Sequence, residues 1–258
     1  MVTNKIVHIM VAPPEMIEAK LAKEAAAILH KDPYEVRLLL SAKIPRLIAH
    51  YPATEEADLI TKQLNALGLK TIALDECELR KSAAAVFIAH SLQFGEKEVT
   101  FRDKGNHLTK LETSDVFLIL KGKLQAAADK VVTATSMKFN LTATLMTGGI
   151  PIWQKVKETT RETSGETQYF IRIYNRLSSE PKVEFFENYF NYSSLGPDLT
   201  PSSLTNLNGI IVKLRTIFPQ ALFDDRLAQL SGISGPSDNQ ARDMELNCRL
   251  IYLYFRSV

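Results

Sequence analysis

The sequence predicts an α+β protein in which a small α/β sandwich is followed by an antiparallel β domain with C-terminal helices. Residues 1–78 alternate short β-branched segments with amphipathic helical segments. Residues 79–192 are dominated by short alternating strands, and the helical period returns after residue 201. Because 258 residues suffice for two cores, we expect one domain at 1–78 and a second at 79–258.

The first domain is predicted to contain six elements in the order strand, helix, helix, strand, helix, strand. Pro14 is expected in the first turn of the first helix, where its missing N–H costs nothing. Asp32 is expected to cap the second helix, and Gly68 to end the third. Pro45 favours an edge position for the second strand. The expected ranges are 5–11, 14–31, 33–40, 44–50, 54–67 and 70–74.

Several stretches of this domain carry a resemblance: 32–40, Ile44-Pro45, 54–58, Gln63-Leu64 and 67–70. They resemble the C-terminal domain of the bacterial ribosomal stalk protein and related adaptor modules, over roughly residues 5–76. In that family a Gly-rich turn before the second helix and a basic cluster on the first helix contact translation GTPases. Here the turn reads Lys31-Asp32-Pro33 and the first helix mixes Glu with Lys. The resemblance therefore implies the fold but not the factor-binding role.

The second domain is predicted to begin as a meander and to end in helices. Expected strands lie at 84–94, 98–102, 108–111, 116–121, 169–174 and 183–192, and expected helices at 201–218 and 239–255. Between them, residues 124–166 follow no regular period, so we expect a long loop there. Within it the alternation of residues 139, 141, 143 and 145 favours an edge strand or hairpin, whereas the polar stretch 155–168 is expected to be mobile.

Antiparallel strands followed by an amphipathic helix resemble a pleckstrin-homology-like barrel that is capped at one end. This resemblance implies a fold and says little about a ligand. A wider array also resembles, as a whole, a group of uncharacterised bacterial proteins over much of residues 30–230, and it implies no activity. The array consists of Gly148-Gly149, 170–174, Leu195-Gly196, 202–206 and 223–227.

Composition excludes several classes of protein. Lys and Arg number 31 against 29 Asp and Glu, and the basic residues form no stripe, so no nucleic-acid partner is expected. No apolar stretch approaches the roughly 20 residues of a membrane span. The first 12 residues lack the pattern of a signal peptide. Cys77 and Cys248 lie far apart without a CxxC motif, which favours a reducing cytoplasm.

No spacing of residues predicts a catalytic, metal or cofactor site. The five histidines, at 8, 30, 50, 90 and 107, show neither HxH nor i, i+4 spacing. A GxSxG motif is absent, and Gly148-Gly149 lacks the Lys-Ser/Thr pair of a phosphate-binding loop. Adjacent carboxylates at 55–56 and 224–225 would point about 100° apart on a helix. We therefore expect no cofactor, no bound metal and no catalysis.

Two groups of residues are candidate contacts for a ligand or partner. Lys121 and Lys123 flank Gly122 at a predicted strand end, where they suit an anionic head group or, alternatively, blunt a sheet edge. Tyr189 and Tyr192 belong to the aromatic strand 183–192. Strand alternation predicts Phe186, Phe190 and Tyr192 on one face and Phe185 and Tyr189 on the other. One face should be core and the other is a candidate partner groove.

These observations favour a non-enzymatic intracellular protein that binds or regulates another protein. The first alternative is peripheral binding of the β domain to an anionic membrane surface through Lys121, Lys123 and basic residues of the 124–166 segment. The second is an enzyme whose site is not visible in residue spacing. The identity of the partner, the pathway and the oligomeric state stay open at this point.

Overall fold

The computed structural model describes residues 6–80, 86–125, 129–139, 153–163, 167–230 and 237–257. They fall into two compact units. The larger unit comprises Met1–Leu124 and Gln168–Val258, and the smaller one is Gln125–Thr167. Helices and strands together confirm the predicted α+β class.

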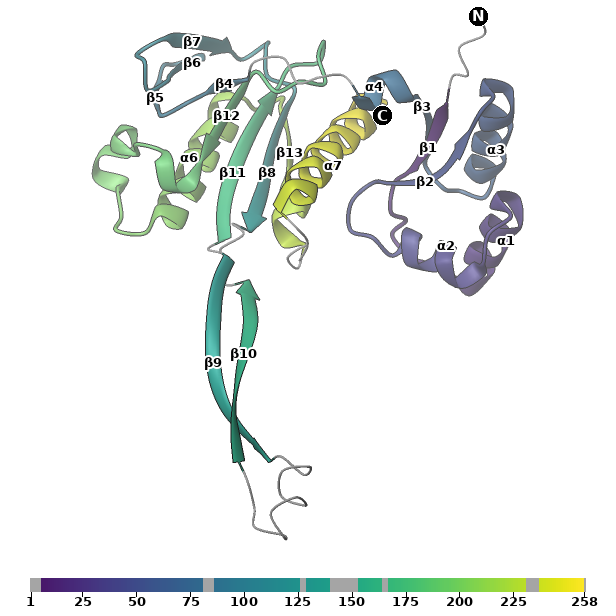
Figure 1. Cartoon of the computed structure of the whole chain (residues 1–258). Helices are drawn as coiled ribbons and strands as arrows, with labels where there is room; N and C mark the ends of the chain where they lie inside the picture. The colour runs from purple at the N-terminus through teal and green to yellow at the C-terminus, as the bar shows by residue number, and fades with distance from the viewer. Residues whose placement is uncertain are drawn as a thin grey trace, which may run out of the picture. The chain divides into compact units, whose positions relative to one another are not determined.

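The larger unit begins with the predicted series of six elements (Figure 1). Its strands form an antiparallel sheet in the order β2-β1-β3. Alternate residues of the central strand, Val7, Ile9 and Val11, are buried against the helices. The edge position of the second strand agrees with the proline before it. The elements are β1 (Val7–Val11), α1 (Ala19–Leu29), α2 (Pro33–Leu40), β2 (Arg46–Tyr51), α3 (Thr54–Ala66) and β3 (Thr71–Asp75).

Local signals at the helix ends are confirmed for α2 and α3 but not for α1. The Asp32 side chain accepts a hydrogen bond from the Tyr34 N–H at 2.8 Å, and Gly68 follows α3 with a φ of 86°. The expected start of α1 near Pro14 is wrong, because the helix begins at Ala19. The N–H of Ala12 instead donates to the Lys70 carbonyl at 2.9 Å, which keeps the chain beside β3 before it crosses to the helices.

The rest of the larger unit contains two sheets. A five-stranded sheet has the order β13-β8-β11-β12-β4, and a three-stranded sheet has the order β5-β6-β7. Their strands are β4 (Phe87–Ile88), β5 (Ser91–Phe94), β6 (Glu98–Arg102), β7 (Leu108–Glu112), β8 (Leu118–Gln125), β11 (Thr167–Tyr174), β12 (Val183–Phe186) and β13 (Leu222–Asp224). The β domain is not wholly antiparallel as expected, because β4 pairs with β12, and β13 with β8, in parallel.

The single strand expected at 84–94 is wrong, because the chain changes sheets within it. The Ala89 N–H donates to the Glu184 carbonyl of β12 at 2.8 Å. The next N–H, that of His90, donates to the Arg102 carbonyl of β6 at 2.7 Å. One segment of chain therefore supplies β4 to the five-stranded sheet and β5 to the three-stranded sheet.

Helices cover both faces of the five-stranded sheet. Ile119 of β8 lies in one core with α6, whereas Leu118 and Leu120 lie in another core with α7. This double burial explains why β8 begins with an uninterrupted apolar run. Both helices agree with the ranges expected from the sequence. The helical elements are α4 (Glu76–Arg80), α6 (Ser203–Ile217), α7 (Ser237–Ser257) and the 3₁₀ turns η1 (Glu187–Tyr189), η2 (Ser193–Asp198) and η3 (Arg226–Gln229).

The core beneath α7 also includes residues of the first sheet. Met10, Ile44 and Leu74 belong to the same buried cluster as Ile251 and Tyr252 of α7. The side chain of Arg249 donates to the Leu79 carbonyl of α4 at 2.8 Å. The N-terminal elements and the β sheets are therefore joined through α7, and the boundary near residue 78 stays a prediction.

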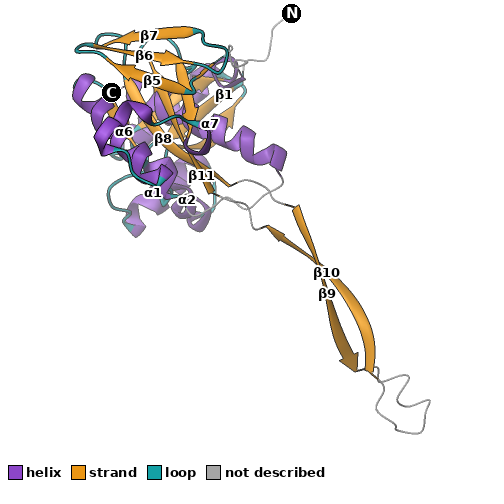
Figure 2. Ribbon diagram, turned by 90° about the vertical axis from the view of Figure 1, so that its left-hand side faces the viewer, coloured by secondary structure: helices purple, strands orange, loops and turns teal. Residues whose placement is uncertain are grey.

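The smaller unit is a hairpin of two long strands, β9 (Asp129–Phe139) and β10 (Trp153–Thr163) (Figure 2). The antiparallel register runs from Trp153 opposite Phe139 to Thr163 opposite Asp129. The long loop expected at 124–166 is therefore wrong for these residues. Their Thr and Val content suits a strand, although frequent Lys and Glu hide any alternation of polarity. The mobility expected for 155–168 stays a prediction. The expected strand residues 141, 143 and 145 lie outside the described residues.

Candidate functional site

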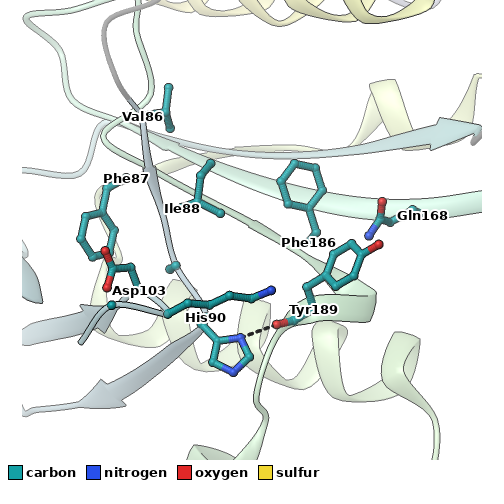
Figure 3. Close-up of a pocket in the computed structure, with 11 residues that line it drawn as sticks. Val86, Phe87, Ile88, His90, Asp103, Gln168, Phe186 and Tyr189 are labelled. Atoms are coloured by element: carbon teal, nitrogen blue, oxygen red, sulfur yellow. Dashed lines mark hydrogen bonds between the residues drawn. The ribbon is translucent and has the colours of Figure 1, made fainter. Parts of the chain in front are cut away.

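A groove of about 730 Å³ lies beside β4, the terminal strand of the five-stranded sheet (Figure 3). Cavities of roughly 300–1,000 Å³ with a mainly apolar lining are typical of ligand sites. The lining consists of residues 86–90, the turn 103–105 after β6, Gln168, Phe186 and Tyr189. The groove thus collects residues from segments that lie up to about a hundred positions apart in the sequence.

Two large apolar side chains of this groove are exposed. Ile88 is 48% exposed and Tyr189 is 62% exposed. Figure 3 shows Ile88 and Phe186 on the same side of the groove, with the Tyr189 ring below Phe186. Phe87 extends in the opposite direction from Ile88 and packs against the core beneath α6. One face of the short strand β4 therefore anchors it, while the other presents Ile88.

The 3₁₀ turn η1 places Tyr189 at the groove. Glu187, the first residue of η1, is buried, and its carboxylate accepts a hydrogen bond from the Ser203 hydroxyl at 2.6 Å. The Tyr192 hydroxyl donates to the Glu187 carbonyl at 2.9 Å. Tyr189 thus projects from a turn whose backbone is anchored on both sides.

His90 holds the same turn from the β4 side. Its ring Nδ1 lies 2.6 Å from the Tyr189 carbonyl oxygen (Figure 3). Because a carbonyl oxygen only accepts, Nδ1 carries the hydrogen of this bond. The His90 carbonyl in turn accepts from the Asn191 N–H at 2.7 Å. This histidine therefore has a structural role at the base of the groove.

Of the ionisable side chains at the turn after β6, Lys104 is the cation that lines the groove. The Asp103 carboxylate accepts from the backbone N–H of His107 and from its ring Nδ1, both at 2.8 Å. The side-chain hydrogen bond from His107 lowers the pKa of Asp103. The Lys104 ammonium lies 5.5 Å from the centroid of the Tyr189 ring, and no carboxylate of the described residues pairs with it.

The structure brings one of the four predicted contact residues to this groove. Tyr189 lines the groove, whereas Tyr192 is 9% exposed in the core, where burial raises its pKa. The predicted facing of the aromatic residues is wrong beyond Phe186, because β12 ends there and η1 breaks the alternation. Phe185 and Phe190, expected on opposite faces, pack together with ring centroids 4.5 Å apart.

Lys121 and Lys123 do not line the groove. The Lys121 ammonium donates to Asn208 at 2.7 Å and lies 5.1 Å from the centroid of the Tyr169 ring. Burial lowers the pKa of Lys121. Lys123 is half-buried. The ammonium of Lys121 is therefore already engaged by α6 and β11.

Sequence reasoning missed Ile88 and Lys104 as groove residues, and it placed Phe186 on the opposite face from Tyr189, although both line the groove. The turn 103–106 was recognisable from its glycine, but its position opposite β4 was not. Groove residues from β4 and β12 meet only because these strands pair across almost a hundred positions. A single sequence carries no local signal for such a pairing.

Other reactive groups do not converge in the described ranges. No three His, Cys, Asp or Glu side chains there are placed to hold a metal ion. Cys248 is fully buried, and burial raises the pKa of its thiol to about 12, so the thiol stays protonated. None of the helices in the described residues is long and apolar enough to cross a membrane.

Comparisons of the chain with family models, with curated proteins and with solved structures find no match. The likenesses to the stalk domain and to the pleckstrin-homology-like barrel therefore stay predictions.

Proposed function

We propose that this chain is a non-enzymatic module that binds another protein through the groove beside β4. The observation that carries the proposal is the joint exposure of Ile88 and Tyr189 over the half-buried Phe186. Exposed apolar and aromatic residues that cluster at a concave site are typical of protein-binding surfaces. Covering these two side chains on binding contributes roughly 1–2 kcal/mol each.

Binding is favoured over catalysis by the state of the ionisable groups in the groove. His90 and Asp103 have the chemistry of an acid or a base, but each is held by a neighbour. Neither is directed toward a common point with a nucleophile in the described lining. A site that orients a partner requires apolar anchors and a rigid frame, and this groove has both.

Binding to an anionic membrane surface is less favoured. An ammonium attracts such a surface when it is free in solvent near it. Lys121 is instead bonded to Asn208 and partly withdrawn from water. The membrane alternative would therefore depend on Lys123 and on basic residues of the smaller unit.

Selection of displayed random peptides on the full chain tests the proposal. Tyr189→Ala should weaken the selected peptides about tenfold, because it removes the largest exposed anchor. Tyr34→Ala is the control, since Tyr34 is 75% exposed on α2 and does not line the groove. Affinities are measured by fluorescence anisotropy.

Three outcomes contradict the proposal. The first is a selection that enriches no peptide, and the second is an equal loss of affinity for Tyr34→Ala and Tyr189→Ala. The third is that the protein floats with phosphatidylserine vesicles, that replacing Lys123 abolishes flotation, and that Tyr189→Ala does not change it. This result would support the membrane alternative.

A further inference from the structure

The main chain of β4 has one open side. In the parallel ladder with β12, Val183 pairs with Phe87 and Glu184 with Ile88. The Ala89 N–H points toward β12, because it donates to the Glu184 carbonyl at 2.8 Å. Alternation along a strand then turns the N–H and C=O of Ile88 away from β12. Within the described ranges no hydrogen bond reaches either group, and no further strand pairs with β4.

The groove reaches this side of β4 through the turn 103–105, because the His90 N–H, which has the same alternation as Ile88, donates to the Arg102 carbonyl just before that turn. Five consecutive residues, 86–90, line the groove, so it follows the chain over the whole of β4 and its two ends. Five residues of extended chain span about 17 Å at ~3.4 Å per residue. An extended segment of similar length therefore fits beside β4, with its own backbone groups facing those of Ile88.

The side chains around the groove define the chemistry of such a segment. Ile88 and Phe186 offer an apolar surface to every second side chain of an added strand. Lys104, held over the Tyr189 ring, is the one Lys or Arg among the described lining residues. The Asp103 carboxylate contacts His107, and among the described residues no ion pair joins Asp103 to Lys104. A carboxylate of the added segment complements the Lys104 ammonium.

We infer that the groove accepts an extended peptide of a partner protein as an added strand on β4, with an apolar side chain against Ile88 and Phe186 and a carboxylate at Lys104. This inference rests on the proposed function and specifies the class of partner. Main-chain hydrogen bonds to Ile88 supply affinity, and the apolar and basic contacts supply specificity. The carboxylate is an Asp or Glu side chain or the terminal carboxylate of the peptide.

The test uses synthetic peptides taken from the selection on the full chain. Amide exchange at Ile88, followed by ¹⁵N NMR, should slow at least tenfold when the peptide saturates the protein. N-methylation of the peptide amide that faces Ile88 should weaken binding about five- to tenfold, because one hydrogen bond is lost. Methylation of the adjacent amide, which points away from β4, is the control.

The carboxylate contact is tested by Lys104→Ala, which should weaken binding roughly two- to fivefold and abolish the effect of salt on it. Lys97→Ala is the control, since Lys97 is exposed and lies outside the groove. Replacing Asp or Glu of the peptide by its amide, and separately amidating its C-terminus, shows which of the two carboxylates Lys104 contacts. If neither change affects binding, the carboxylate assignment is overturned.

The failures of the two proposals are distinguishable. Suppose that peptide binding depends on Tyr189, but that N-methylation does not weaken it and bound peptide does not slow amide exchange at Ile88. Strand addition is then overturned while the proposed function stands. If no peptide depends on Tyr189, both are overturned. A light-scattering mass of two chains, reversed by the Ile88→Lys variant, would identify a second copy as the occupant and overturn the inference.

Discussion

The ring of Phe170 occupies the space into which a side chain at position 122 would extend. A Cβ built on Gly122 would lie 2.2 Å from Cζ of that ring. Gly122 lies in β8 and Phe170 in the neighbouring strand β11, so the missing side chain lets the ring pack over the backbone of β8. The glycine between Lys121 and Lys123 is therefore explained by packing and does not require an anion-binding turn.

We expect Gly122→Ala to lower the free energy of unfolding by roughly 1–3 kcal/mol, because the ring or the strand must shift. Gly209→Ala is the matched control. A Cβ at Gly209 in α6 would lie 3.5 Å from Leu195, an ordinary contact. Alanine is also the better helix former by about 1 kcal/mol. Urea unfolding measures both, and an equal loss in the two variants would show that the Phe170 contact is not the cause.

At the scale of elements, buried charges connect β11, β12 and α7. Arg172 donates to Glu184 at 2.7 Å and to Glu245 of α7 at 2.6 Å. The residues Arg172 and Glu184 are only 5% and 6% exposed. A buried charge is tolerated when it is paired and hydrogen-bonded. These contacts fix the register of α7 against the sheet, because only one position of the helix places Glu245 beside Arg172.

Glu184→Leu leaves Arg172 with one carboxylate in place of two, in a site largely closed to water. We expect a loss of roughly 3–5 kcal/mol in the free energy of unfolding. The control is Glu98→Ala, which breaks the exposed pair with Lys110 and should cost less than about 1 kcal/mol. Urea unfolding of both variants decides, and a cost for Glu184→Leu as small as that of the control would contradict the role of the network.

Elements with local end signals were predictable from the sequence, and elements defined by distant partners were not. The Asp32 cap of α2 forms the expected hydrogen bond with the Tyr34 N–H. Ser202 caps α6 in a similarly local way, because its hydroxyl oxygen accepts from the Thr205 N–H at 3.3 Å. The division of 84–94 between two sheets depends on Glu184 and Arg102. Of the four predicted contact residues, only Tyr189 lies in the groove, and its exposure comes from the 3₁₀ turn η1, which the alternation of the predicted strand 183–192 does not indicate.

At the scale of the whole molecule, the larger unit is continuous across the point where the smaller unit is inserted. The strands on either side of the insertion, β8 and β11, are neighbours in one sheet. The hairpin β9–β10 forms a separate two-stranded sheet. The core residues beneath α6 and α7 that the structure describes belong to the larger unit.

Replacing residues 125–167 by an Asn-Gly turn should therefore leave the larger unit folded, because such a turn joins adjacent antiparallel strands. We expect one cooperative thermal transition within about 3 °C of the full chain, which corresponds to roughly 1 kcal/mol. Circular dichroism follows the transition, and Tyr189-dependent peptide binding serves as the control for the groove. Loss of the cooperative transition would show that the larger unit depends on the smaller one.

The position of α7 in the sequence has a consequence for synthesis on the ribosome. Met10, Ile44 and Leu74 share a core with α7, and Arg46 contacts Asn247 across 201 positions. At about 5–20 residues per second, the chain between Leu74 and α7 takes roughly 10–30 s to emerge. Throughout that interval the apolar face of the first sheet lacks the cover that α7 provides. We therefore expect this part of the core to be completed only when α7 has been made.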